Sequence, residues 1–153
     1  MLLAHFRLTR VLQTIMNKSY EELLSIPTFE GRFEYLKIGG NVGEATFGSH
    51  RYLNQLLYKM PEWRDARRKV IVRDGAFDLA HPDYEMGEKQ PIYVHHINPI
   101  TIDDILERKP VVLDLSNLIV CSFNTHQAIH YGSKDLLPER LLSRSPNDTC
   151  PWR

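Results

Sequence analysis

The chain has 153 residues and is 42% hydrophobic, which suits one globular domain with a buried core. Its 19 basic and 19 acidic side chains balance, so overall charge does not by itself indicate a protein that binds nucleic acid. The sequence has no apolar run of about 18 residues, and two cysteines without an export signal favour a cytoplasmic protein with no membrane span.

The first 60 residues predict a mainly helical and turn-rich region that packs on the rest of the chain. Residues 1–25 carry apolar side chains at a spacing near 3.6, which predicts one or two helices ending before Pro27. A glycine-rich stretch follows, in which residues 32–38 form either a strand or a short helix. Residues 51–60 predict a further helix.

The next helix is predicted to begin at Pro61, because proline suits a first helical turn. Residues 59–73 contain six basic and two acidic side chains, so a local basic face can exist in a neutral chain. Arg73 and Asp74 form either an internal ion pair or part of a DNA-binding surface. Three further arginines share one helix face, as a solvated surface or as phosphate contacts: Arg64, Arg67 and Arg68.

Residues 91–94 are β-prone and lead into His95 and His96, before Pro99 ends the strand. Imidazole is the commonest metal ligand and accepts protons near neutral pH. Adjacent residues of a strand point to opposite faces, so this pair supplies one ligand and one neighbour that can reach a bound phosphate. On that ground we assign His95 as a metal ligand and His96 as a general base.

His126 and His130 are four residues apart, so on a helix they project from one face and can bind one ion. Asn124 or Thr125 can cap the start of this short helix, and Gly132 suits the position just after its end. The sequence therefore predicts a helix that carries two metal ligands.

The order of these motifs resembles the HNH nucleases, which have a ββα-metal fold. The resemblance includes a histidine pair after a strand, Asn117 in Ser-Asn-Leu, and His-x-x-x-His on a helix. The nearest pattern is that of the colicin-type DNases, and phage-encoded HNH proteins carry endings similar to residues 125–132. The resemblance covers about residues 61–132. It implies that Asn117 braces the loop bearing the base, and that cleavage leaves 3′-hydroxyl and 5′-phosphate ends.

Two features depart from the family pattern. Many HNH proteins hold a structural zinc with two Cys-x-x-Cys pairs, whereas residues 75–79 contain no cysteine and the chain has only Cys121 and Cys150. We therefore expect packing to hold the core. Residues 101–109 form an insertion-like stretch, and residues 101–106 predict a short helix with a start like a capping box.

We interpret the chain as an α+β protein with a ββα-metal core at residues 61–132, a mainly helical region at 1–60 and a C-terminal tail at 133–153. The expected function is metal-dependent hydrolysis of DNA. The predicted ligands of one divalent ion are His95, His126 and His130. The all-imidazole set favours Zn²⁺ or Ni²⁺, and Mg²⁺ or Mn²⁺ also support activity in this class. The side chains expected to contact DNA are Arg64, Arg67, Arg68 and Arg73.

Other functions remain compatible with the sequence. The main alternative is a non-catalytic, zinc-stabilised DNA-binding or phage-packaging accessory protein, with a phage terminase as partner and the host cytoplasm as location. A metallohydrolase acting on small molecules is a third possibility. A thiol hydrolase using Cys121 and His96 leaves His126 and His130 unexplained.

The remaining candidate side chains have simpler interpretations. We expect the other three histidines at the surface: His5, His50 and His81. Trp63 and Tyr58 are expected in the core, and Cys121 is expected to be a buried thiol.

Overall fold

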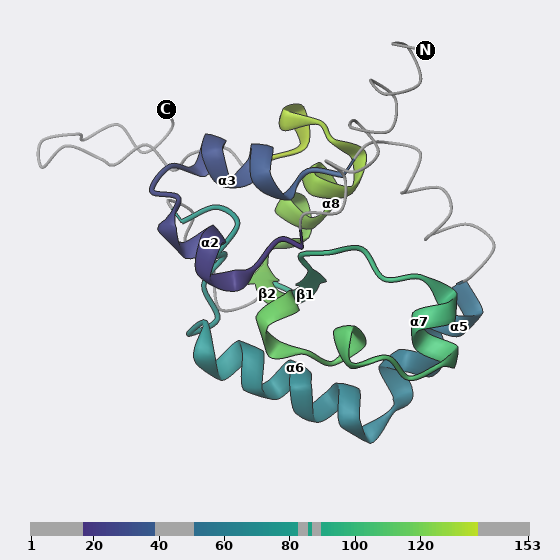
Figure 1. Ribbon diagram of the computed structural model, residues 1–153. Coiled ribbons are helices and arrows are strands. Elements are labelled where there is room, and N and C mark those ends of the chain that lie inside the picture. Colours follow the sequence, from purple (N-terminus) through teal and green to yellow (C-terminus); the bar gives the residue numbers. More distant parts are fainter. Residues whose placement is uncertain (1–16, 39–50, 83–85, 87–89, 138–153) are drawn as a thin grey trace, which may run out of the picture.

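The structure is a computed structural model that describes residues 17–38, 51–82, 86 and 90–137 (Figure 1). Within this part of the chain, helices surround a small antiparallel sheet, in agreement with the predicted α+β class. None of the described helices is both long enough and apolar enough to cross a membrane. The elements follow in the order α2 (Tyr20–Ser25), α3 (Phe29–Leu36), α5 (Arg51–Lys59), α6 (Pro61–Arg73), β1 (Tyr93–His96), α7 (Ile102–Leu106), η2 (Pro110–Val112), η3 (Leu115–Asn117), β2 (Leu118–Cys121), α8 (Phe123–Tyr131) and η4 (Lys134–Leu136).

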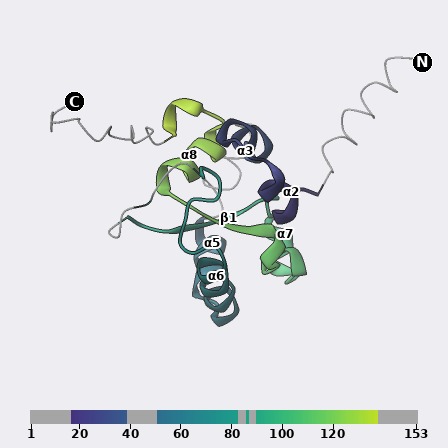
Figure 2. The same cartoon turned by 90° about the vertical axis from the view of Figure 1, so that its left-hand side faces the viewer.

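The sheet is an antiparallel pair in which His95 of β1 lies opposite Ile119 of β2, and His96 lies opposite Leu118. Successive side chains of a strand alternate between faces, so the two histidines face opposite sides of the sheet. Both views show α8 and α3 on one side of the strands and α6 on the other (Figures 1 and 2). The sheet thus lies between two layers of helices, and each histidine of the pair faces one of them.

Each face of the sheet covers its own hydrophobic cluster. The cluster on the α8 side includes Leu23, Leu36, Ile97, Ile119, Cys121 and Ile129. The cluster on the α6 side includes Leu57, Trp63, Ala66, Val70, Leu118 and Val120. Because all four residues of β2 are buried, this strand forms the shared wall between the two clusters.

Two buried carboxylates bind the segment after α6 to β2. Asp74 accepts a hydrogen bond of 2.9 Å from the backbone N–H of Val120, and Asp78 accepts one of 3.0 Å from the N–H of Ser122. Between them, the N–H of Leu79 donates to the carbonyl of Val120 at 3.1 Å. Buried polar contacts therefore hold this cysteine-free segment against the strand, alongside hydrophobic packing.

Most predicted helices are present where the structure describes them. Residues 32–36 form the second half of helix α3 rather than a strand, and Lys37 is the C-cap of that helix. Helix α6 begins at Pro61 as predicted, and α7 has the expected capping box between Thr101 and Asp104. The predicted strand is β1, which begins at Tyr93 and ends with the histidine pair, before Pro99. Residues 1–16 and most of the tail lie outside the described residues.

Four of the expectations about single side chains are settled by burial. Trp63 and Cys121 are buried as predicted, with 3% and 0% of their surfaces exposed. Two other predictions were wrong. His81 is only 2% exposed because its ring stacks on Phe29 at 4.3 Å, whereas Tyr58 is 56% exposed and lies outside the core. His5 and His50 lie outside the described residues.

Candidate metal centre

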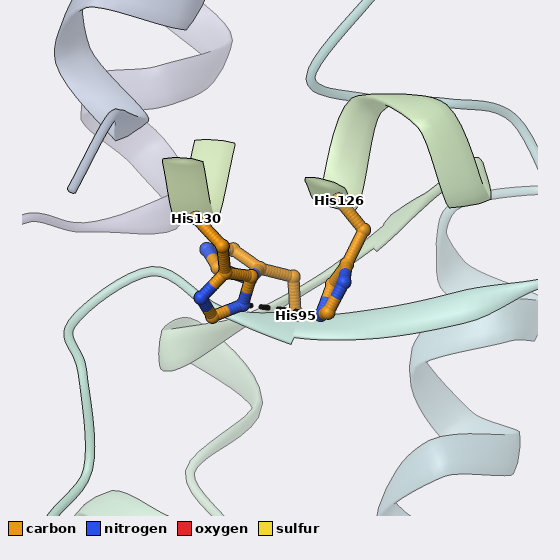
Figure 3. Close-up of side chains that lie close together, drawn as sticks. All are labelled: His95, His126 and His130. Carbon is orange, nitrogen blue, oxygen red and sulfur yellow. Dashed lines mark hydrogen bonds between the residues drawn. The ribbon is translucent and has the colours of Figure 1, made fainter. Parts of the chain in front are cut away.

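Three imidazoles converge between β1 and α8. His95 rises from the strand toward His126 and His130, which descend from the helix (Figure 3). One ring nitrogen from each residue lies within 4.8 Å of the other two. The Nε2 atoms of His126 and His130 are 3.2 Å apart. The structure therefore brings together the three side chains assigned as ligands from the sequence.

Helix α8 places its two histidines through local signals at both ends. Ser122 is the N-cap and accepts a hydrogen bond from the N–H of Thr125, so neither Asn124 nor Thr125 caps the helix as predicted. Gly132 ends it with φ = 64°, the left-handed conformation that glycine adopts at little cost. The four-residue spacing then sets His126 and His130 one turn apart on the face toward β1.

The distance between the two helix histidines is close to that between two ligands of a small divalent ion. Two nitrogens bound tetrahedrally at about 2.0–2.1 Å from zinc are separated by roughly 3.3–3.4 Å, and the Nε2 atoms of His126 and His130 are already 3.2 Å apart. The Nε2 atom of His95 is buried and has no hydrogen-bond partner among the described residues. A buried nitrogen without a partner is costly, and a metal ion would satisfy it.

The three imidazoles are kept in the neutral form that metal ligands require. Burial, reinforced by the neighbouring histidines, lowers the pKa of His95 well below its usual value. The same two causes lower the pKa of His126 to about 3 and that of His130 to about 4. All three rings are therefore unprotonated at neutral pH, with a lone pair to offer.

His96 lies on the other face of β1. Its ring stacks on Trp63 with a centroid distance of 5.3 Å, and its Nε2 lies 2.9 Å from the carbonyl oxygen of Val112. A carbonyl oxygen only accepts, so Nε2 carries the proton and Nδ1 keeps its lone pair. Burial lowers the pKa of His96, and the Val112 hydrogen bond partly opposes that effect. The ring is thus held in one tautomer with a basic nitrogen available.

Asn117 ties together the two loops on either side of the site. Its Oδ1 accepts a hydrogen bond of 2.8 Å from the N–H of Asn98, just after β1, and its Nδ2 donates to the carbonyl of Val111 at 3.1 Å. Val111 precedes Val112, whose carbonyl holds His96. Asn117 is only 3% exposed and therefore acts as a buried brace between these loops.

A cavity of about 520 Å³ lies along β1 and receives side chains from both of its faces. All four clustered histidines contribute to its wall: His95, His96, His126 and His130. The α5–α6 side supplies Leu57, Tyr58, Trp63, Arg64 and Arg67. The ligand cluster and the proposed base therefore open into the same space, although they lie on different faces of the strand.

The four arginines assigned to DNA contact have different surroundings. Arg64 and Arg67 line the cavity, and Arg67 also donates to the carbonyl of Ile92 at 2.9 Å. Arg68 is absent from the cavity wall and pairs with Asp65 at 2.9 Å.

Arg73 is occupied by internal contacts. It pairs with Asp74 at 2.6 Å, donates to the backbone carbonyls of Leu115 and Leu118, and lies over the ring of Tyr20 at 3.7 Å. The pair with Asp74 is the internal ion pair that was one of the two alternatives expected for Arg73. The two hydrogen bonds to backbone carbonyls join α6 to η3 and β2.

The structure disfavours a thiol hydrolase built from Cys121 and His96. Cys121 lies opposite Tyr93 and belongs to the cluster on the α8 side, whereas His96 faces Trp63 on the α6 side. Burial raises the pKa of the Cys121 thiol well above its usual value, which opposes thiolate formation. The two groups that this alternative requires are on opposite faces of the sheet.

Sequence reasoning missed Asp78 and the carbonyl of Val112. Asp78 stands between Phe77 and Leu79, and an acidic residue in an apolar run was a signal that could have been used. The carbonyl of Val112 gave no signal because every residue has one.

Comparison of the chain with models of known families, with curated proteins and with solved structures gave no match.

Proposed function

We propose that this protein is a metal-dependent endonuclease that hydrolyses DNA phosphodiester bonds, with the ββα-metal core of the HNH nucleases. One observation carries the proposal. His95, His126 and His130 converge on one point, while His96 is oriented by the Val112 carbonyl beside the same cavity. Three ligands and one positioned base are the side chains that single-metal phosphodiester hydrolysis requires.

The order of elements supports the same assignment. An antiparallel pair, β1 and β2, is followed directly by α8, so the strand and the helix that supply the ligands are adjacent. Asn117 braces the loops that flank the histidine pair through its bonds to Asn98 and Val111. These contacts fit the role that the family resemblance implies for this asparagine.

The residues of the site divide the chemistry between them. When bound by the three histidines, a divalent ion offsets the negative charge that develops on the phosphate. His96 accepts a proton from the attacking water at Nδ1, since Nε2 donates to Val112. The resemblance implies 3′-hydroxyl and 5′-phosphate products. The imidazole donors support Zn²⁺ or Ni²⁺, with Mg²⁺ and Mn²⁺ as further candidates.

The number of ligands favours catalysis over a purely structural zinc. Structural zinc sites are usually closed by four protein ligands, whereas catalytic sites keep one position open. Within the described residues the group contains only His95, His126 and His130, and it borders a cavity. An accessory role in DNA binding or packaging, with a phage terminase as partner, is the outcome to consider if metal and DNA bind without cleavage.

A plasmid-nicking assay tests the proposal directly. The protein is stripped with a chelator and then supplied separately with Zn²⁺, Ni²⁺, Mn²⁺ or Mg²⁺. We expect His96→Ala to abolish nicking while metal affinity stays near that of the unmodified protein, whereas His126→Ala loses both. If His96→Ala loses metal as severely as His130→Ala, the assignment of ligand and base is wrong. Absence of nicking with every metal would reject the nuclease.

A further inference from the structure

The cavity wall contains apolar and aromatic side chains as well as the histidines. These side chains, called the apolar wall below, are Leu57, Tyr58, Ile92, Val94, Pro99 and Ile100. An ion and a phosphate group require neither apolar walls nor an aromatic ring. The volume of about 520 Å³ lies within the range of roughly 300–1,000 Å³ that is typical of small-ligand pockets. The cavity therefore has room for more of the substrate than the reacting phosphate.

The charge of the wall selects an anion. The lining residues include Arg64 and Arg67 and contain no aspartate or glutamate. Among the described residues neither arginine forms an ion pair, whereas the nearby Arg68 and Lys69 both pair with Asp65. The positive charge beside the cavity is thus not balanced by an acidic neighbour within the described part of the chain.

Tyr58 offers an aromatic surface next to this charge. Trp63 is stacked on His96 and only 3% exposed, whereas Tyr58 is 56% exposed as a residue, and the centroids of the Tyr58 and Trp63 rings are 5.6 Å apart. Exposed aromatic rings stack on nucleobases in proteins that bind single strands, because every base has a π face. Arginine, an aromatic ring and apolar walls together match one nucleotide.

The depth of the site points to an unpaired strand. His95 is only 2% exposed, so the reacting phosphate has to enter the cavity to approach the ligand cluster. One nucleotide fits a pocket of this volume, whereas a base-paired step brings the second strand with it. An extruded or single-stranded nucleotide meets this requirement at lower cost than an intact duplex, because its base is not held in a stack.

We propose that the apolar wall of the cavity binds the unpaired base beside the scissile phosphate, stacked on Tyr58 with Arg64 near its phosphate. This inference rests on the proposed nuclease function and deepens it, because it assigns single-stranded or locally unpaired DNA as the preferred substrate. The pocket reads base shape and stacking, and no side chain in its wall carries a carboxylate to accept hydrogen bonds from a base.

Binding of a short oligothymidylate tests the pocket. Affinity is measured by fluorescence anisotropy with zinc-loaded protein in a His96→Gln background, so that DNA is not cut. We expect the single strand to bind more tightly than a duplex of equal length. Tyr58→Ala should weaken single-strand binding roughly 5- to 150-fold, the range reported for loss of one stacked base. Tyr58→Phe keeps the ring and should bind as the parent does.

Controls separate the pocket from nonspecific effects. Phe77 is another exposed aromatic residue, 61% exposed and absent from the cavity wall, so Phe77→Ala should leave affinity unchanged. Unchanged single-strand affinity in Tyr58→Ala, or equal affinity for duplex, overturns the pocket whatever the nicking assay gives. If the unmodified protein cuts no DNA but binding still depends on Tyr58, the nuclease proposal fails and the nucleotide pocket stands.

Discussion

The hydroxyl of Thr125 donates a hydrogen bond of 2.6 Å to the buried carboxylate of Asp78. Thr125 directly precedes the ligand His126, and the same carboxylate oxygen accepts from the N–H of Ser122, the N-cap of α8. The other oxygen accepts from the N–H of His81 at 3.1 Å. Asp78 thus fixes the first turn of the helix that supplies two of the three candidate ligands.

Replacing Asp78 by asparagine should destabilise the protein and loosen the metal centre. Asparagine presents an NH₂ group in place of one carboxylate oxygen, so this donor would face a buried group that now donates a hydrogen bond to Asp78. We expect the free energy of unfolding to fall by about 2 kcal/mol, the cost of leaving a buried polar group unsatisfied. Urea unfolding measures this loss, and zinc titration of the folded variant should give a weaker affinity.

The matched control is Asp103→Asn, because Asp103 is an exposed aspartate in the first turn of α7. Surface substitutions of this kind change stability by about 0.5 kcal/mol or less. If the two variants unfold at the same urea concentration, Asp78 does not brace α8.

The histidine cluster should make the metal-free protein sensitive to acid. An imidazole whose pKa falls on folding binds fewer protons in the native state than in the unfolded chain. The free energy of unfolding therefore decreases as pH falls below about 6.5. The pH range over which this stability is lost extends down to about pH 4 for His130 and about pH 3 for His126. Within this range, the free energy of unfolding changes by up to about 1.4 kcal/mol per pH unit for each histidine that is neutral in the folded protein.

Urea unfolding in the presence of a chelator, between pH 7.5 and pH 4.5, measures this effect. His126→Gln removes one titrating group and should give a shallower dependence on pH than the unmodified protein. Stability that is independent of pH across this range in the unmodified protein would mean that the cluster is not buried in solution.

Local signals in the sequence were sufficient for the helix of the candidate site. The spacing of His126 and His130, with Gly132 after them, predicted a helix and one shared face because both features depend only on nearby residues. The alternation of a strand likewise separated His95 from His96. The N-cap was misplaced because Ser122, Asn124 and Thr125 are all chemically suitable caps, and the sequence alone does not say at which of them the helix begins.

Contacts between distant segments could not be predicted in this way. His81 is buried because Phe29, 52 positions earlier, covers its ring. Tyr58 and Trp63 are similar in sequence context, yet only Trp63 is covered by His96. The carbonyl of Val112 orients His96 only because the loop after α7 returns to β1. Such pairings depend on the tertiary fold and leave no pattern in the sequence.

The pH dependence of cleavage should report on His96. Protonated His96 cannot accept a proton from water, so activity should rise with pH through the pKa of this group. Burial lowers that pKa, and we therefore expect the midpoint of the acid limb to lie below the ordinary value of about 6.5. Initial nicking rates between pH 4.5 and pH 8, with saturating metal at each pH, give the midpoint. A midpoint above 6.5, or faster cleavage at pH 5 than at pH 7.5, would exclude His96 as the base.

The dependence of DNA affinity on salt distinguishes the arginines that α6 presents. Each lost phosphate contact should lower the salt slope by about 0.7 on a single strand and about 0.9 on a duplex. Arg64→Gln and Arg67→Gln should each produce such a change, because both residues line the cavity. These contacts carry no base information, so affinity should fall about equally for all sequences.

Arg68→Gln is the matched control on the same helix, since Arg68 pairs with Asp65 outside the cavity and should leave the slope unchanged. Arg73→Gln should instead lower the free energy of unfolding, because it removes contacts to Asp74 and to the carbonyl of Leu118. Anisotropy titrations across a range of salt concentrations, in the His96→Gln background, measure the slopes of the Arg64, Arg67 and Arg68 variants, and urea unfolding measures the effect of Arg73→Gln. Equal slopes for Arg64→Gln and Arg68→Gln would mean that the cavity arginines do not contact phosphate, and DNA binding would then require a different surface.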